Sequence, residues 1–159
     1  MRIKRFSVMA ATGLLVTLAL SVAARAGDQH SGTWKMNPAK SMYNPGPPAK
    51  SVTLTIVSDE NSFKVNAEGF GGDGYPTHVE YSAKFDGKDY TITGVPNGDT
   101  VSAKRIDSNT MESTIKAGGQ VVMTVRSTVS KDGKTRTSVF KGKDAQGRDV
   151  NNVVVYEKQ

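Results

Sequence analysis

The segment HVEYSAKFDGKDYTIT, residues 78–93, carries the clearest strand pattern in the chain. Apolar and polar residues alternate through its first half, so one face of an extended strand would be buried and the other solvated. The apolar positions are Val79, Tyr81, Ala83 and Phe85. Asp86-Gly87-Lys88 follows, and its glycine supplies the positive φ that a tight hairpin needs. The segment predicts two antiparallel strands joined by a short turn.

The same rhythm continues on both sides of this hairpin. Short runs rich in β-branched and aromatic residues alternate with Gly, Asp and Asn turns, which is typical of all-β proteins. With a first strand around Trp34, the runs predict ten strands, at 52–57, 63–67, 79–85, 90–93, 100–106, 110–116, 120–130, 134–141 and 149–157. The short connections favour antiparallel neighbours.

Closure of the sheet is the next expectation. An open sheet of this size would leave two unpaired edges and an apolar face in water, and a closed barrel removes both problems. A β-sandwich is the alternative, but it usually needs longer Greek-key connections. We therefore predict a single antiparallel up-and-down β-barrel of about eight to ten strands. The one place for a helix is 37–42, where Asn37 can cap, and Pro45, Pro47 and Pro48 limit it to a single turn.

The first 26 residues have the three parts of a secretory signal peptide. Arg2, Lys4 and Arg5 form a positive start, an apolar run covers 8–24, and Ala24-Arg25-Ala26 offers a small-x-small cleavage site. An uncleaved membrane anchor is the rival interpretation, but this run is shorter than the roughly 20 residues that span a bilayer. We expect cleavage after Ala26, a barrel domain at 27–159, and a periplasmic or secreted protein.

Loss of the signal changes the charge balance. The whole chain has 21 Lys and Arg against 15 Asp and Glu, and four of the basic residues lie in the signal, which leaves 17 basic residues in the domain. Their even spacing among acidic residues argues against a nucleic-acid partner and against stable membrane association after cleavage. The chain has no cysteine, which excludes disulfides and Cys-based metal sites. We expect a monomer.

Both ends of the domain resemble the calycins, the superfamily of lipocalins and fatty-acid-binding proteins. Gly32-Thr33-Trp34-Lys35 resembles the first-strand motif, and 151–158 (NNVVVYEK) is similar to the last strand of the fatty-acid-binding branch. The chain is closest in this respect to small secreted bacterial lipocalin-like proteins. The resemblance implies a barrel that carries a small hydrophobic molecule.

Two departures from that pattern bear on function, and one further feature of it has several candidates. The fatty-acid-binding proteins place a helical pair between their first two strands, whereas the proline-rich segment 37–49 cannot form one. Their carboxylate clamp has an Arg two residues before the last-strand Tyr, and Val154 stands at that place before Tyr156. In lipocalins a late basic residue packs on the Trp, and the sequence offers Arg126, Arg136 or Arg148 for this role without choosing among them.

Strand parity selects the side chains that face the barrel interior. Trp34 is expected to plug one end of the barrel rather than to contact ligand, because one large aromatic on the first strand covers much apolar area. The predicted ligand-binding residues of the interior are Phe63, Tyr81, Phe85, Tyr90, Arg105, Met123, Val125 and Tyr156. Small barrels either fill their interior or keep a cavity, and the sequence leaves this choice open.

The charged residues considered for ligand binding lie on different faces of their strands. Arg126 lies on the polar face of its strand and is expected in solvent, whereas Arg105 shares parity with Val101 and Ala103. Arg105 is therefore the candidate for binding an anionic head group, unless a bulge before Ile106 exchanges the faces. His78 and Glu80 share a polar face, but no nucleophile or oxyanion donor accompanies them, so we expect no enzyme.

No cofactor or metal site is expected either. Two isolated histidines without cysteine do not make a transition-metal site, and 69–74 (GFGGDG) lacks the residues of a phosphate loop. Asp73 and Asp86 lack the spaced acidic partners of a calcium loop. The sequence favours a lipocalin-like protein that binds a small hydrophobic or amphipathic molecule. The alternative is an envelope structural or interaction module with a filled core and no ligand.

Overall fold

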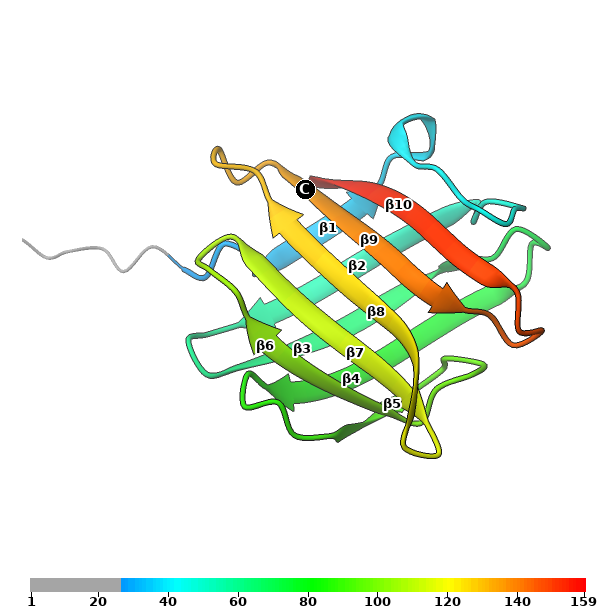
Figure 1. Ribbon diagram of the computed structural model, residues 1–159. Helices are drawn as coiled ribbons and strands as arrows, with labels where there is room; N and C mark the ends of the chain where they lie inside the picture. The colour runs from blue at the N-terminus through cyan, green and yellow to red at the C-terminus, as the bar shows by residue number, and fades with distance from the viewer. Residues whose placement is uncertain (1–26) are drawn as a thin grey trace, which may run out of the picture.

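The computed structural model describes residues 27–159. The predicted signal peptide and its cleavage site lie outside the described residues. Ten strands form a closed antiparallel barrel in which each strand pairs with its neighbours in sequence and β1 pairs with β10 (Figure 1). This confirms the predicted all-β, up-and-down barrel.

The element boundaries follow the alternation in the sequence closely. The strands are β1 (Gly32–Met36), β2 (Ser51–Ser58), β3 (Ser62–Phe70), β4 (Pro76–Lys84), β5 (Tyr90–Thr93), β6 (Thr100–Arg105), β7 (Thr110–Ala117), β8 (Gln120–Val129), β9 (Thr135–Lys143) and β10 (Asp149–Lys158). A single 3-10 turn, η1 (Pro38–Lys40), follows β1. Strand β3 extends past the predicted end at Ala67, because Gly69 and Phe70 still pair with β2.

The connection between β1 and β2 forms the single turn that its prolines predict. The side chain of Asn37 caps η1 by accepting a hydrogen bond from the backbone N–H of Lys40. Residues 41–50 then run without a helix, and Met42 makes an isolated bridge to Val153 of β10. No helical pair covers the barrel within the described part of the chain.

The hydrophobic core fills the part of the barrel interior that lies next to β1. Trp34, Met36, Phe63, Met111 and Tyr156 belong to one cluster of buried side chains, and Ile92, Val101 and Ile115 form a smaller one. Phe63 stacks on Phe85 with ring centroids 4.8 Å apart and meets Tyr81 edge to face. These contacts make the half of the barrel near Trp34 a packed core.

Candidate ligand-binding site

The two ends of the barrel differ in how they are covered. The connections 59–61, 85–89, 106–109 and 130–134 lie at the end where the described chain begins, at the left of Figure 1. The connections 37–50, 71–75, 94–99, 118–119 and 144–148 lie at the opposite end. We call these the closed end and the open end.

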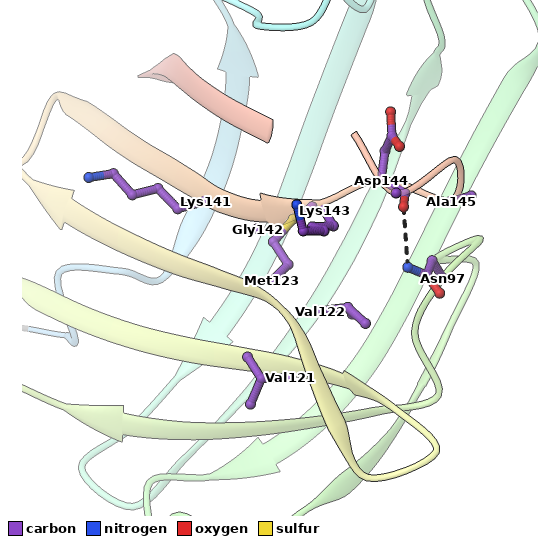
Figure 2. A pocket seen from close by; sticks show the side chains of 10 residues that line it. Asn97, Val121, Val122, Met123, Lys141, Gly142, Lys143, Asp144 and Ala145 are labelled. Carbon is purple, nitrogen blue, oxygen red and sulfur yellow. Dashed lines mark hydrogen bonds between the residues drawn. The ribbon is translucent and has the colours of Figure 1, made fainter. Parts of the chain in front are cut away.

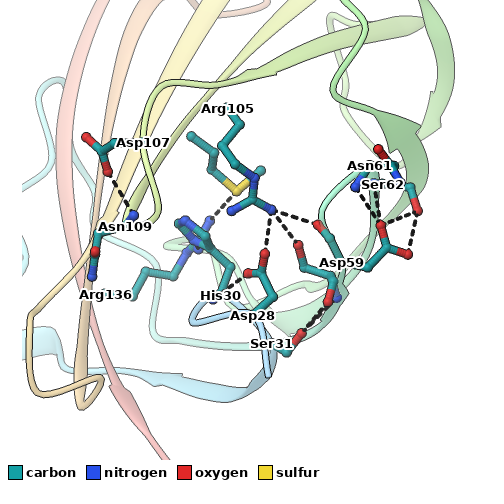
Figure 3. Close-up of polar contacts among 12 residues, drawn as sticks. Asp28, His30, Ser31, Asp59, Asn61, Ser62, Arg105, Asp107, Asn109 and Arg136 are labelled. Atoms are coloured by element: carbon teal, nitrogen blue, oxygen red, sulfur yellow. Dashed lines mark hydrogen bonds and ion pairs between the residues drawn. The ribbon is translucent and has the colours of Figure 1, made fainter. Parts of the chain in front are cut away.

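The closed end is covered by the chain that precedes β1. Trp34 is 0 % exposed there, and its indole N–H donates to the carbonyl of His30 at 2.9 Å. The Arg105 guanidinium pairs with the Asp28 carboxylate and donates to the carbonyl of Asp59 (Figure 3). Residues 28–31 thus fold back across this end and are fastened to β1 through Trp34, to β2 through Ser58 and to β6 through Arg105.

Several cationic side chains in the described part of the chain contact residues 28–31 or lie near them. Arg136 of β9 is the most deeply buried of these. Only 5 % of the residue is exposed, and NH1 lies 2.6 Å from Nδ1 of His30 (Figure 3). NH2 meets the sulfur of Met111 at 3.7 Å, while Nε has no hydrogen-bond partner. None of these partners is a carboxylate, and burial lowers the pKa of Arg136.

The side chains that line the barrel interior beside Arg136 are polar rather than apolar. Ser127 and Ser138 are buried and share a hydrogen bond of 2.8 Å between their hydroxyls, and Ser113 is buried on the neighbouring strand. Tyr156 lies opposite Arg136 in the β9–β10 pairing. The pKa of Tyr156 is raised by burial, and Tyr43 raises it further while Arg136 lowers it.

Tyr43 is one of the residues that line a cavity of about 630 Å³ at the open end. Its hydroxyl donates to the sulfur of Met36 at 3.1 Å, which links the cavity lining to the core beneath. The apolar part of the lining comes from strand residues and loops: Tyr43, Val95, Ile115, Val122, Met123 and Val150. The volume is within the range of pockets that hold small molecules.

The rim of this cavity is built from loops and from the strand ends beside them. Pro45 and Pro47 of the β1–β2 connection and Tyr75 of the β3–β4 turn contribute on one side. Polar and charged residues complete it, namely Asp73, Thr77, Asn97, Lys143, Asp144, Gln146, Arg148 and Asn152. Arg148 is held by Asp144, with Nε 2.7 Å from a carboxylate oxygen. The cavity is therefore apolar inside and polar at its rim.

A second hollow of about 410 Å³ adjoins the first beside β8 and β9. The two share Val122 and Met123 in their linings, and Asn97 donates to the carbonyl of Asp144 at 3.4 Å (Figure 2). Figure 2 shows that this bond joins the β5–β6 loop to the β9–β10 loop. The space arises where β8 leaves β9, since their pairing begins only at Met123 and Gly142.

Of the residues predicted to bind ligand, Met123 lines the open-end cavity. Phe63 and Tyr156 are buried in the core, and the remaining interior side chains pack against it, namely Tyr81, Phe85, Tyr90 and Val125. Tyr90 also turns its hydroxyl out to Asp86 at 2.9 Å. Ligand contact by these packed residues stays a prediction.

Two predictions about basic residues need correction. Arg105 does point inward, 4.3 Å from the Phe85 ring centroid, but its guanidinium is at the closed end and is occupied by Asp28. It is therefore not a free anchor for an anionic head group in the cavity. The cation over Trp34 is Lys158, at 4.9 Å from the ring, and not one of the three arginines proposed from the sequence.

Arg126 and His78 lie on the outer face of the barrel, as their strand parity predicted. Arg126 is exposed and reaches Glu112 of β7 at 3.7 Å. His78 lies on the outer face, with ring nitrogens 3.6 Å from Glu68 and 3.8 Å from Glu80.

Among residues 27–159 no helix combines the length and apolarity needed to cross a membrane.

The residues that sequence reasoning missed belong to loops and to the cover of the closed end. Ile115 and Val150 could have been predicted from the sequence, because their parity in β7 and β10 places them inside the barrel. The loop residues of the rim show no periodicity, and only the alternation of the connections between the two ends groups them. His30 precedes the first strand, so no strand pattern marks it.

Comparison with known proteins adds an architectural parallel. No family model and no curated protein matches the sequence. Among solved structures, the chain is similar to the ileal bile acid-binding protein of zebrafish, crystallised with cholic acid. The two are 12 % identical with a TM-score of 0.47, over 82 % of this chain and 99 % of that one. What this chain binds has to be argued from its own residues.

Proposed function

We propose that the protein is a carrier that binds a small amphipathic molecule in the open-end cavity. The observation that carries the proposal is a cavity of about 630 Å³ with apolar walls and a polar rim. Burying apolar ligand surface there is favourable by roughly 25 cal/mol per Å². The ligand enters with its apolar part first, because Ile115, Met123 and Val150 line the inside and the charged residues stand at the loops.

The site supports binding rather than catalysis. Its charged residues, Asp73, Lys143, Asp144 and Arg148, lie on rim loops or at the end of β9, and two of them neutralise each other. A reaction would need a nucleophile and a base in mutual contact. For the location we propose a periplasmic or secreted protein, and the support for this is the composition of residues 1–26.

The test uses an uncharged reporter, N-phenyl-1-naphthylamine, which becomes fluorescent in apolar surroundings. We expect saturable binding to the purified protein, and an at least tenfold weaker affinity for Ile115→Trp, whose larger side chain fills the cavity. Thr55→Trp is the matched control, because Thr55 is exposed on the outer face of β2. Equal dye affinity for wild type and Ile115→Trp, with both proteins folded by near-UV circular dichroism, would rule the cavity out.

A second candidate function is an interaction module without ligand. It is favoured by three exposed apolar side chains near the open end, Met42, Phe70 and Tyr75, of which Tyr75 is 73 % exposed. Clustered exposed apolar residues often mark interaction surfaces. A Met42→Asp/Phe70→Asp variant separates the two functions, because neither residue lines the cavity. It should keep dye binding if the protein is a carrier, and lose envelope cross-links if it is an interaction module.

A further inference from the structure

The closed end is held shut by a short segment, residues 28–31, which we call the N-terminal latch. Its attachments come from several elements. Ser31 exchanges hydrogen bonds with the backbone of Ser58, donating at 3.0 Å and accepting at 2.8 Å. The Asp28 carboxylate pairs with Arg105 and also accepts the backbone N–H of His30 at 2.9 Å. The His30 side chain reaches Arg136 inside the barrel.

The contact between His30 and Arg136 requires an uncharged imidazole. A guanidinium can only donate, so Nδ1 of His30 must be the acceptor and its proton must lie on Nε2. A proton on Nδ1 would set two N–H groups and two positive charges against each other at 2.6 Å. Both side chains are buried, so water cannot screen that repulsion.

The other charges around His30 do not remove this conflict. Asp28 of the latch and Asp107 of the β6–β7 turn favour a charged imidazole, while Arg136 of β9 and Arg105 of β6 oppose it. Burial is the largest influence, and together these lower the pKa of His30 from 6.5 to about 4. Nε2 of His30 has no hydrogen-bond partner, so a charged ring would also be incompletely solvated.

We propose that the latch is an acid-released closure: protonation of His30 detaches residues 28–31 and opens the Trp34 end of the barrel while the strands stay paired. The latch carries no ladder hydrogen bonds, because β1 begins at Gly32. Its release breaks the indole bond to the His30 carbonyl and uncovers Trp34 and Arg136. The inference concerns the end opposite the cavity and does not depend on the proposed ligand.

The single tryptophan of the chain is a built-in reporter for this opening. At pH 7.5 we expect acrylamide to quench Trp34 weakly, because the side chain is 0 % exposed. Between pH 6 and 3.5 quenching should rise at least fivefold, reversibly, because the pKa of His30 is 6.5 when it is released and about 4 when it is latched, and acid in this range favours release. Far-UV circular dichroism should not change over the same range. Simultaneous loss of the β signal would show global unfolding instead and would overturn the proposal.

Two variants assign the transition to the right group. His30→Gln keeps an acceptor for Arg136 but does not titrate, so the rise in quenching should disappear. Asp28→Asn removes the other titratable latch residue and its pair with Arg105, so quenching at pH 7.5 should be higher than in wild type. A further rise in acid should remain, because His30 is kept. An unchanged acid transition in His30→Gln would refute the proposal.

Amide hydrogen exchange on the wild type is decisive if His30→Gln fails to fold. In acid, the exchange of amides 30–34, corrected for the intrinsic rate, should accelerate while amides of β7 and β8 remain protected. Uniform protection of all these amides down to pH 3.5 would contradict the proposal.

Discussion

A buried arginine without a carboxylate partner is the most unusual residue of the described chain. Arg136 is held by a neutral histidine and a thioether sulfur, which are weak partners for a full charge. Removing a charge from water costs several kcal/mol even after relaxation. The contact with His30 therefore offsets only part of this cost, and each side chain depends on the other.

This dependence predicts strong coupling in a double-mutant cycle. Arg136→Met leaves Nδ1 of His30 buried without a donor and should cost about 2 kcal/mol of unfolding free energy. His30→Leu leaves the guanidinium with one partner fewer and should cost about 3 kcal/mol. The double variant should lie close to wild type, because both polar groups are gone. Urea unfolding at pH 7.5, followed by Trp34 fluorescence, measures all four proteins.

Arg126→Met serves as the control for this cycle. Arg126 is exposed and paired with Glu112 at the surface, so its loss should change stability by less than about 0.5 kcal/mol. Strictly additive effects of the His30 and Arg136 variants would show that the two residues are not coupled.

Strand parity predicted the interior residues where the inner face is apolar, and it assigned no inner face where that face is largely polar. Phe63, Val65 and Ala83 are buried as their alternation indicates. In β9 the inward residues are Arg136 and Ser138, while Val139 lies on the other parity. Phe140 shares the parity of Arg136 and packs against the core, so a hydrophobic pattern alone does not decide the inner face of such a strand. His30 could not be predicted, since its burial depends on a segment that precedes the sheet.

At the scale of elements, the turns were the easiest features to predict and the loop contacts the hardest. The Asp-Gly-Lys turns and the η1 cap depend on neighbours within four residues, so the sequence contains their whole cause. The cavity rim brings the β1–β2, β3–β4 and β9–β10 connections together, which are far apart in the sequence. Their contacts follow from barrel closure and not from local preference.

Two glycines in turns allow two costs of substitution to be compared: the cost of a positive φ and the cost of a close backbone contact. Gly94 and Gly87 both have positive φ, +82° and +73°. A Cβ at Gly94 would lie 1.7 Å from the carbonyl oxygen of His78, whereas a Cβ at Gly87 meets nothing within 4 Å. Gly87→Ala should therefore cost about 1 kcal/mol for the left-handed conformation alone, and Gly94→Ala more than about 2 kcal/mol.

Urea midpoints with unchanged m-values measure this difference. A Gly94→Ala variant as stable as Gly87→Ala would mean that the β4 and β5 backbones separate at little cost. It would contradict the tight approach of the two strands at the point where β5 begins to turn.

At the scale of the molecule, the sequence predicted the barrel but left open whether it was filled or hollow. Both descriptions apply, each to one end. The closed half is packed around Trp34, Phe63 and Tyr156, and the open half contains the cavity. Side-chain volumes must be placed in three dimensions before such a division can be seen, which explains why composition and alternation did not reveal it.

A half-filled barrel sets a limit on ligand length. Binding of straight-chain alcohols, measured by displacement of N-phenyl-1-naphthylamine, should strengthen by about 0.8 kcal/mol per methylene group and then level off once the cavity is full. Met36 is buried, and its sulfur accepts the hydroxyl hydrogen bond of Tyr43, which lines the cavity. Met36→Ala deepens the cavity, so the plateau should move to longer alcohols, although the protein loses about 2–5 kcal/mol of stability.

Met111→Ala is the matched control for this shift. It removes the same volume from an equally buried methionine, but Met111 lies beside Arg136 near the closed end. Its stability should fall by a similar amount while the plateau stays at the wild-type length. If both variants moved the plateau equally, or neither did, the cavity would not end at Tyr43 and Met36. A shift confined to Met36→Ala places the ligand tail in the open half, directly above the packed core.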